Sequence, residues 1–169
     1  MPMTVRKAFA YITSGRRLLV FAHAHHPDAG IQVPAGTMRP DEEPIAAALR
    51  EAHEETGLVD LDVVGILGET VFDDRPYGND VLHHRTFVHL RRREETPEQW
   101  EHWETDPHGE PGGRYLLVLS WASLDAPLPD LIPGHDAFIP ALVAALDRPA
   151  QANRPSRVPA PRPVHRDAQ

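Results

Sequence analysis

The chain has 169 residues, no cysteine and a formal net charge of −8, with 41% hydrophobic and 25% charged residues. A chain of this length can bury a core without a disulfide or structural metal, and the lack of cysteine excludes disulfide scaffolds, thiolate zinc sites and thiol nucleophiles. No apolar run approaches the ~18 residues of a membrane span, and the N-terminal segment lacks a signal-peptide core. We therefore expect a cytoplasmic protein with no membrane partner.

The charge is unevenly distributed between residues 1–147 and residues 148–169. The second segment carries five arginines, one aspartate and five prolines, a charge of +4 that leaves −12 on the first. We predict one folded domain over residues 1–147 and a disordered Pro/Arg-rich tail over residues 148–169, which has almost nothing to bury. The acidic domain argues against a stable nucleic-acid partner and is suited to divalent cations.

The first predicted elements are a hairpin, a short strand and a helix. Residues 5–13 and 17–23 are rich in β-branched, aromatic and aliphatic side chains on either side of a Ser-Gly-Arg turn, which predicts two paired strands. A brief strand is expected over residues 31–33. A helix is predicted from Pro44, which suits a first helical turn, to Gly57, which suits a left-handed C-terminal cap.

This helix has an apolar stripe and is followed by two long strands. Ile45, Leu49 and Ala52 recur at helical spacing, so we expect their side of the helix to pack on a sheet. Residues 58–72 and 81–90 are predicted strands, joined by a stretch of turn-forming residues. The Pro-Tyr-Gly sequence in that stretch is interpreted as a turn and not as a determinant of substrate.

The last third of the chain begins with a polar stretch, residues 91–113. It is long for a structureless connection, so we expect a functional loop with some helix of its own. Its Trp100 and Trp103 are suited either to stacking a base or to covering the sheet. A strand over residues 114–121 and an amphipathic helix over residues 136–146 complete the pattern. Strands grouped around two helices predict an α/β (α+β) class, built as an α/β/α sandwich with a mixed β-sheet.

The most informative part of the predicted first helix is its cluster of carboxylates. Glu54 and Glu55 lie three and four positions after Glu51, so at ~100° per residue all three project from one side. Like charges at this spacing repel, and negative charge is also unfavourable near a helix C-terminus. Arg50 can reach one carboxylate but does not neutralise three. A solvated acidic face is the alternative, but hard divalent cations with oxygen ligands would compensate the charge.

Glycine brackets this acidic helix. Gly36 permits a tight turn and a close backbone approach, and Gly57 stops the helix just after the carboxylates. A loop at Gly36 can present a backbone carbonyl, from Ala35 or Gly36 itself, to the same cation. The bracketing makes a simple solvated face a weaker explanation.

The whole segment from residue 36 to residue 58, GTMRPDEEPIAAALREAHEETGL, resembles the Nudix box of the Nudix hydrolases. Gly36 is followed after five residues by Glu42, and after seven more by the run REAHEETGL, so every charged and glycine position of the box is filled. Ala52 stands where larger aliphatics are common, and Asp41 stands where glycine is frequent. Neither departure removes a ligand.

This resemblance implies a Nudix hydrolase domain over residues 1–147 with the Nudix-type sandwich. It also implies metal-dependent hydrolysis of a diphosphate linkage in a nucleoside diphosphate linked to another moiety, with Mg²⁺ or Mn²⁺ as cofactor and water attacking phosphorus. The alternative is a non-catalytic Nudix-fold nucleotide-binding or regulatory module, which the intact carboxylates of the box disfavour. We expect a small-molecule nucleotide diphosphate derivative as partner. The oligomeric state, including a homodimer, is left open.

The resemblance also suggests a role for each box residue. Glu51 and Glu55, one helical turn apart, are the expected metal ligands, together with the backbone at Ala35. Glu54 is a third ligand or the base that deprotonates the attacking water. Arg50 would orient a carboxylate through a charge-assisted hydrogen bond, and Glu42 would pair with Arg50 or brace the loop.

An acidic residue outside the box often completes the site in this family, as a metal ligand or as the base. The polar stretch supplies several candidates, and we select Glu104 and Glu110 because aromatic or Gly-rich neighbours can fix them near a pocket. The substrate-binding residues stay unassigned.

Overall fold

The computed structural model describes residues 1–105 and 114–149. Its elements, in chain order, are β1 (Met3–Ser14), β2 (Arg17–His23), η1 (Pro27–Ala29), β3 (Ala35–Thr37), α1 (Pro44–Thr56), β4 (Asp62–Asp73), η2 (Arg75–Tyr77), β5 (Val81–Arg91), β6 (Gln99–Trp103), β7 (Leu116–Ser123) and α2 (Ile139–Asp147). Neither helix in this part of the chain is long and apolar enough to cross a membrane.

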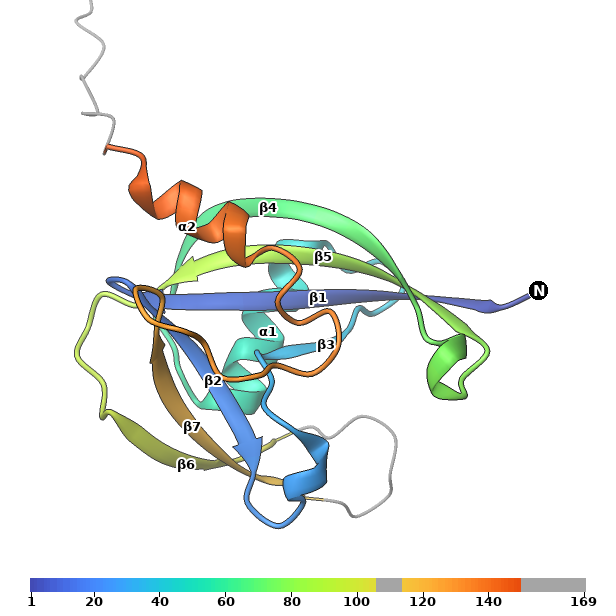
Figure 1. The fold of residues 1–169 in the computed structure, drawn as a ribbon, viewed down its shortest axis with the longest axis horizontal. Helices are drawn as coiled ribbons and strands as arrows, with labels where there is room; N and C mark the ends of the chain where they lie inside the picture. The colour runs from blue at the N-terminus through green and yellow to red at the C-terminus, as the bar shows by residue number, and fades with distance from the viewer. Residues whose placement is uncertain (106–113, 150–169) are drawn as a thin grey trace, which may run out of the picture.

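The seven strands form one mixed sheet in the order β4-β5-β1-β2-β7-β6, with β3 paired to β1 off this path. β1 runs parallel to β5 over almost its whole length. On its other edge, residues 7–9 in the middle of β1 pair with β3, and only its last two residues pair with β2. The sheet therefore divides beside the middle of β1, and α1 lies against it near β3 (Figure 1).

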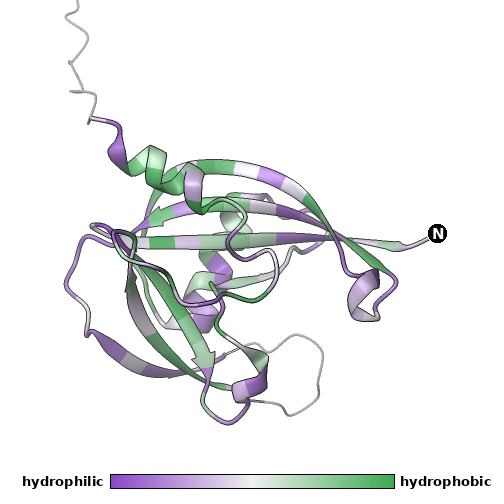
Figure 2. Cartoon of the chain, viewed as in Figure 1, coloured by the Kyte–Doolittle hydropathy of each residue, from purple (hydrophilic) through white to green (hydrophobic). Residues whose placement is uncertain are grey.

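The two faces of the sheet are covered by different helices. Successive residues of a strand point to opposite faces, so Ala8, Ala10 and Ile12 of β1 join the core under α1. Phe9 and Tyr11 join the core under α2. Figure 2 shows hydrophobic residues concentrated in the central strands and in α2. The predicted mixed-sheet sandwich with a helix on each face is confirmed.

Both predicted helical stripes face the sheet. Ala52 is fully buried, and Ile45 and Leu49 pack against the same core. In α2, Leu142 is fully buried, with Phe138 and Leu146 packed around it. Phe138 lies so close to the backbone of β4 that a Cβ on Gly68 would come within 2.1 Å of its ring.

The helix expected within residues 91–113 is wrong for the part that the structure describes. Residues 99–103 form β6, which pairs antiparallel with β7. Trp100 and His102 are partly buried, whereas Gln99, Glu101 and Trp103 are exposed, and this two-residue period belongs to a strand. Residues 106–113 lie outside the described residues.

Three predicted boundaries also differ. Residues 31 and 32 make only isolated bridges, and the strand in this region is β3. β4 begins at Asp62 because Asp60 has a positive φ of 56°, which interrupts an extended strand. α2 begins at Ile139, with Pro140 in its first turn, and ends at Asp147. Most of the predicted tail, residues 150–169, lies outside the described residues, so its disorder stays a prediction.

Candidate active site

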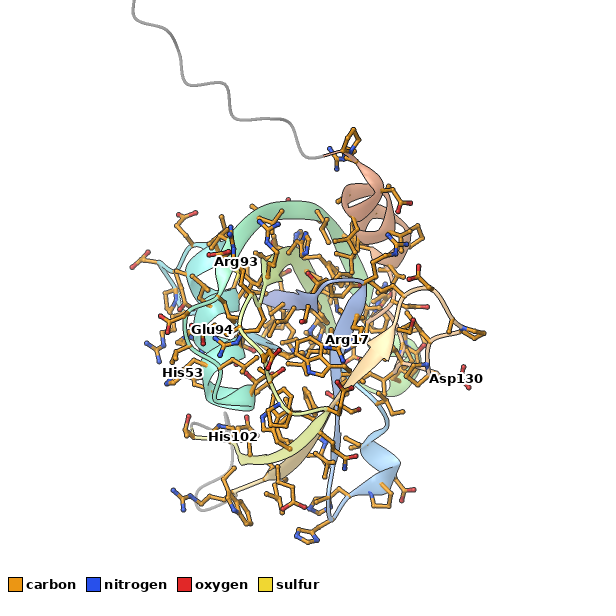
Figure 3. All side chains as sticks on the ribbon, turned by 90° about the vertical axis from the view of Figure 1, so that its left-hand side faces the viewer. Arg17, His53, Arg93, Glu94, His102 and Asp130 are labelled. Atoms are coloured by element: carbon orange, nitrogen blue, oxygen red, sulfur yellow. The ribbon has the colours of Figure 1, made fainter. Side chains whose placement is uncertain are left out.

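The C-terminal end of α1 is held by β6. Gly57 closes the helix in the left-handed conformation, with φ of 74°. The Trp100 Nε1–H donates to the carbonyl of Thr56 at 3.0 Å, and His102 Nε2 lies 3.1 Å from the carbonyl of Glu54, an acceptor to which it must donate. Figure 3 shows His102 below this end of the helix. These donors satisfy carbonyls that a helix end leaves free, so β6 fixes the part of α1 that carries the carboxylates.

Arg50 connects the loop before α1 to the carboxylates on it. Its Nε and Nη2 each donate to the Glu42 carboxylate at 2.8 Å, and Nη2 also donates to the Thr37 carbonyl at 3.1 Å. Its Nη1 donates to Glu51 at 2.6 Å and to Glu54 at 3.1 Å. The hydrogen bonds from Arg50 lower the pKa of Glu42 to about 2. Glu42 therefore stays ionised and holds the guanidinium in one orientation.

Glu51 and Glu55 are buried side by side against β3. Their exposed fractions are 3% and 7%, and the Ala35 N–H donates to Glu55 Oε2 at 2.9 Å. A Cβ on Gly36 would lie 2.0 Å from the Glu51 carboxyl carbon, so a side chain at this position would displace the Glu51 carboxylate. Burial, followed by the charges of Glu51 and Glu104, raises the pKa of Glu55 well above its usual value. The site therefore brings carboxyl groups together where burial and neighbouring charge oppose the ionisation of Glu55.

The carboxylates fit a hard divalent cation by their chemistry. Within residues 1–105 and 114–149, no group of three or more His, Asp or Glu side chains is arranged to hold a metal ion, and Arg50 engages both Glu51 and Glu54. Mg²⁺ sites, however, often use only one or two carboxylates and complete the coordination with water and substrate phosphate. The buried pair Glu51 and Glu55 meets that smaller requirement, and a cation beside it would favour the ionised form of Glu55, which burial first and the charges of Glu51 and Glu104 next disfavour.

One basic side chain that the sequence analysis did not select lies near this pair, and a second is its neighbour across two strands. Lys7 of β1 and Arg85 of β5 are partners in the strand register. The pKa of Lys7 is lowered, first by burial and then by Arg85, while Glu55 and Glu51 oppose that shift. Lys7 therefore lies within electrostatic reach of both carboxylates.

Arg85 is held by its neighbours without a carboxylate partner. It is only 7% exposed, its Nη1 donates to the Pro133 carbonyl at 3.2 Å, and its guanidinium carbon lies 3.6 Å from the ring centroid of Phe72. In the described part of the chain its buried Nε has no hydrogen-bond partner. The sequence did contain a signal for both bases, because Lys7 and Arg85 share their strand faces with the large aromatic residues Phe9 and Phe87, two positions further along each strand.

The structure brings most of the predicted site residues together. Arg50 contacts Glu42, Glu51 and Glu54, and Glu55 contacts the backbone of Ala35; Glu104, which follows β6, is near enough to influence Glu55. Glu110 lies outside the described residues. Trp100 packs into the core under α1 and so covers the sheet, whereas Trp103 is 49% exposed.

Comparison with known proteins places this arrangement in a family. The model of the NUDIX domain matches residues 3–142. The chain therefore belongs to the NUDIX family.

Similar curated sequences include diphosphoinositol polyphosphate phosphohydrolase 3-beta of Homo sapiens, which is 40% identical over 86 residues, covering 50% of this chain and 46% of the relative. Diphosphoinositol polyphosphate phosphohydrolase 2 of Mus musculus is 38% identical over 84 residues, covering 50% and 42%. The match thus spans less than half the length of these relatives.

Solved structures share the fold. A UDP-X diphosphatase aligns with a TM-score of 0.59 and 14% identity over 85% of this chain and 63% of its own. A MutT NUDIX hydrolase from Burkholderia pseudomallei aligns with a TM-score of 0.55 and 19% identity over 83% and 98%. At these identities, the likeness establishes the fold alone.

Proposed function

We propose that this chain hydrolyses a diphosphate linkage in a nucleotide-type substrate, a nucleoside diphosphate linked to another moiety, by water attack at phosphorus with Mg²⁺ or Mn²⁺. One observation carries the proposal: the carboxyl groups of Glu51 and Glu55 are buried together against Gly36 and β3, in a complete Nudix box. Burying two carboxylates side by side lowers the stability of the fold. This cost has no structural benefit, so the pair supports a functional role for the helix.

The proposed metal ligands are Glu51 and Glu55, with the backbone near Ala35. A divalent cation held there supplies neutralisation of the diphosphate and of the charge that develops on the leaving oxygen. Arg50 has a positioning role, because its hydrogen bonds to Glu42 on one side and to Glu51 and Glu54 on the other fix the direction of those carboxylates.

Lys7 and Arg85 are proposed to bind phosphate oxygens of the substrate. Lys7 is largely withdrawn from water within electrostatic reach of the carboxylates, and Arg85 is buried next to it in the strand register. The Nε of Arg85 is a buried donor that lacks an acceptor in the described part of the chain. A cation with little solvent around it binds phosphate more strongly than an exposed one, because less hydration is lost.

Two residues are proposed as the base, and their environments differ. Glu54 is bound to the Arg50 guanidinium, whereas Glu104 follows β6 and lies near Glu55. Replacing the base by glutamine should lower kcat ~10²–10⁴-fold with little change in substrate affinity. We expect that pattern for Glu54→Gln, with a smaller fall in kcat for Glu104→Gln. The reverse order at saturating Mg²⁺ assigns the base to Glu104.

The test of the activity is a substrate panel with the full chain and Mg²⁺, Mn²⁺ or EDTA. The panel contains ADP-ribose, a UDP-sugar, a dinucleoside polyphosphate, a nucleoside triphosphate and a diphosphoinositol polyphosphate. The last is included because the curated relatives are named for it and because Lys7 and Arg85 suit a polyanion. Products are separated by chromatography, and reaction in ¹⁸O-water identifies the phosphorus attacked.

The rival function is a module that binds a nucleotide without cleaving it. It predicts nucleotide affinity in calorimetry with no turnover of any panel member, with either metal. Turnover that EDTA abolishes and that Glu55→Gln removes supports the hydrolase, whereas turnover that persists in EDTA contradicts the metal-dependent mechanism.

A further inference from the structure

A second cleft lies on the α2 side of the sheet, away from the carboxylates. It has a volume of about 860 Å³ and is walled by β4, the end of β5 and the C-terminal end of α2. Its polar lining consists of His89, Arg91 and Arg148. On β5, His89 lies four residues beyond Arg85, roughly 13 Å along the strand, and the buried Phe87 stands between them. The cleft is therefore separate from the candidate active site.

The wall that β4 contributes is apolar and unusually exposed. Val64 is 44% exposed and Ile66 is 49% exposed, although both are large aliphatics on a sheet edge. Ala145 and Leu146 of α2 and Leu67 of β4 extend this lining. Ligand sites commonly combine such an apolar wall with a few placed polar groups in a cavity of 300–1,000 Å³.

The polar groups of the cleft are basic and lack acidic partners. Neither Arg91 nor Arg148 forms an ion pair in residues 1–105 and 114–149. The nearby carboxylates are engaged elsewhere, since Asp62 pairs with Arg93 and Asp147 pairs with Arg16. Two uncompensated guanidiniums beside an apolar wall favour an anionic occupant.

His89 adds a buried polar group with unused hydrogen-bonding capacity. It is 3% exposed, and its Nε2 lies 2.8 Å from Thr13 Oγ1. Its Nδ1 is buried and has no partner among the described residues. Buried ring nitrogens are normally paired, so this one is suited to a group that enters the cleft.

We infer that this cleft binds a small amphipathic anion, with its apolar chain or ring against Val64, Ile66 and Leu146 and its acidic head group at Arg91 and Arg148. The inference does not depend on the proposed hydrolase activity. The chain's own residues 150–169 are disfavoured as the occupant because they carry four arginines and one aspartate. Their charge has the same sign as the cleft.

The experiment is calorimetry on the full chain at pH 7 with three probes of equal length: octanoate, octanol and octylamine. We expect octanoate to bind at least about tenfold more tightly than the other two. Arg91→Gln and Arg148→Gln should each weaken octanoate severalfold, whereas the control Arg75→Gln, which removes a charge beyond the opposite end of β4, should not. Octanoate should also shift the imidazole nitrogen signals of His89 and leave those of the exposed His53 unchanged.

The same measurements can overturn the inference. Absence of octanoate binding to the full chain means that the cleft is closed or filled by the tail or by a second copy. Equal binding of octylamine, or unchanged affinity in both arginine variants, means that apolar contact alone is responsible. Glu55→Gln separates this site from the active site, since it should abolish hydrolysis and leave octanoate binding intact.

Discussion

Two of the buried polar clusters among the described residues, one under each helix, are built on opposite principles. The cluster under α1 consists of charged groups, with one arginine shared among Glu42, Glu51 and Glu54, and with Glu55 beside them. The cluster under α2 consists of neutral groups. There the Tyr11 hydroxyl donates to the His135 carbonyl at 2.6 Å.

In the second cluster the polar groups are neutral and hydrogen-bonded, whereas the first cluster buries a carboxyl group whose ionisation its surroundings oppose. His135 Nδ1 accepts the Val33 N–H at 3.1 Å, and burial, followed by Arg85 and Lys7, lowers the pKa of His135 to about 3. This histidine is neutral at pH 7 and joins a loop to the core. Burial of polar groups therefore does not itself indicate a functional site. Buried charged groups that opposite charges do not fully neutralise do indicate one.

The largest expected effect is a loss of activity without a loss of stability, after substitution of a carboxylate in the charged cluster. Glu55→Gln should lower kcat by about 10²–10⁴-fold, because it removes a charge from the proposed metal site. The melting temperature should stay the same or rise, because glutamine carries no buried charge. Enzyme assays and thermal unfolding measure both. His53→Gln, on an exposed position of the same helix, serves as the control. A variant that loses its fold together with its activity would assign Glu55 a structural role.

A smaller effect is expected when the charge is kept but the geometry is changed. Arg50→Lys cannot reproduce the paired hydrogen bonds to Glu42 while also reaching Glu51. We expect kcat to fall about 10–100-fold, the range found for groups that orient metal ligands. Metal titration of the activity should shift to higher concentration. An unchanged metal requirement would contradict the positioning role.

The basic pair should affect binding more than turnover. Arg85→Lys keeps the charge but loses the planar stack on Phe72 and the Nε donor. We expect KM for the best substrate of the panel to rise about tenfold, ~1.4 kcal/mol, with a smaller change in kcat. Arg75→Lys, in an exposed pair with Asp73, is the matched control. A fall in kcat with constant KM would place Arg85 in the chemical step.

For the neutral cluster, we expect an effect only on how the free energy of unfolding depends on pH. His135 has a pKa of about 3 when folded and 6.5 as its ordinary value, so between these pH values the unfolded chain binds the extra proton. This histidine therefore lowers stability as pH falls from 6.5 toward 3, by up to ~1.4 kcal/mol per pH unit.

The test replaces His135 by asparagine, whose side-chain oxygen can still accept the Val33 N–H. Urea unfolding at pH 7 and pH 5 should give a smaller pH-dependent loss in His135→Asn than in the parent. His53→Gln should leave the slope as it is. Equal slopes for His135→Asn and the parent would show that protonation of this histidine is not coupled to unfolding.

The sequence by itself determined the helix of the Nudix box, the two-helix sandwich and the identity of the clustered carboxylates. These features are local, because the spacing of Glu51, Glu54 and Glu55 follows from helical geometry and the limits of α1 follow from Pro44 and Gly57. Ile45 and Leu49 likewise identified the buried side. The strand nature of residues 99–103 was missed because their alternation is short and interrupted by charge.

Only the tertiary structure decided which distant side chains meet. Lys7 and Glu104 come within electrostatic reach of the carboxylates because β1 pairs with β3 and because β6 passes the end of α1. Arg85 lies beside Lys7 through the parallel register of β1 with β5, and none of these pairings is encoded in a local pattern. The cleft at His89 is likewise not encoded in a local pattern, because it forms where the C-terminal end of α2 meets β4 and the end of β5. Local periodicity specifies elements and their faces, whereas contacts between strands far apart in sequence depend on how the whole sheet closes.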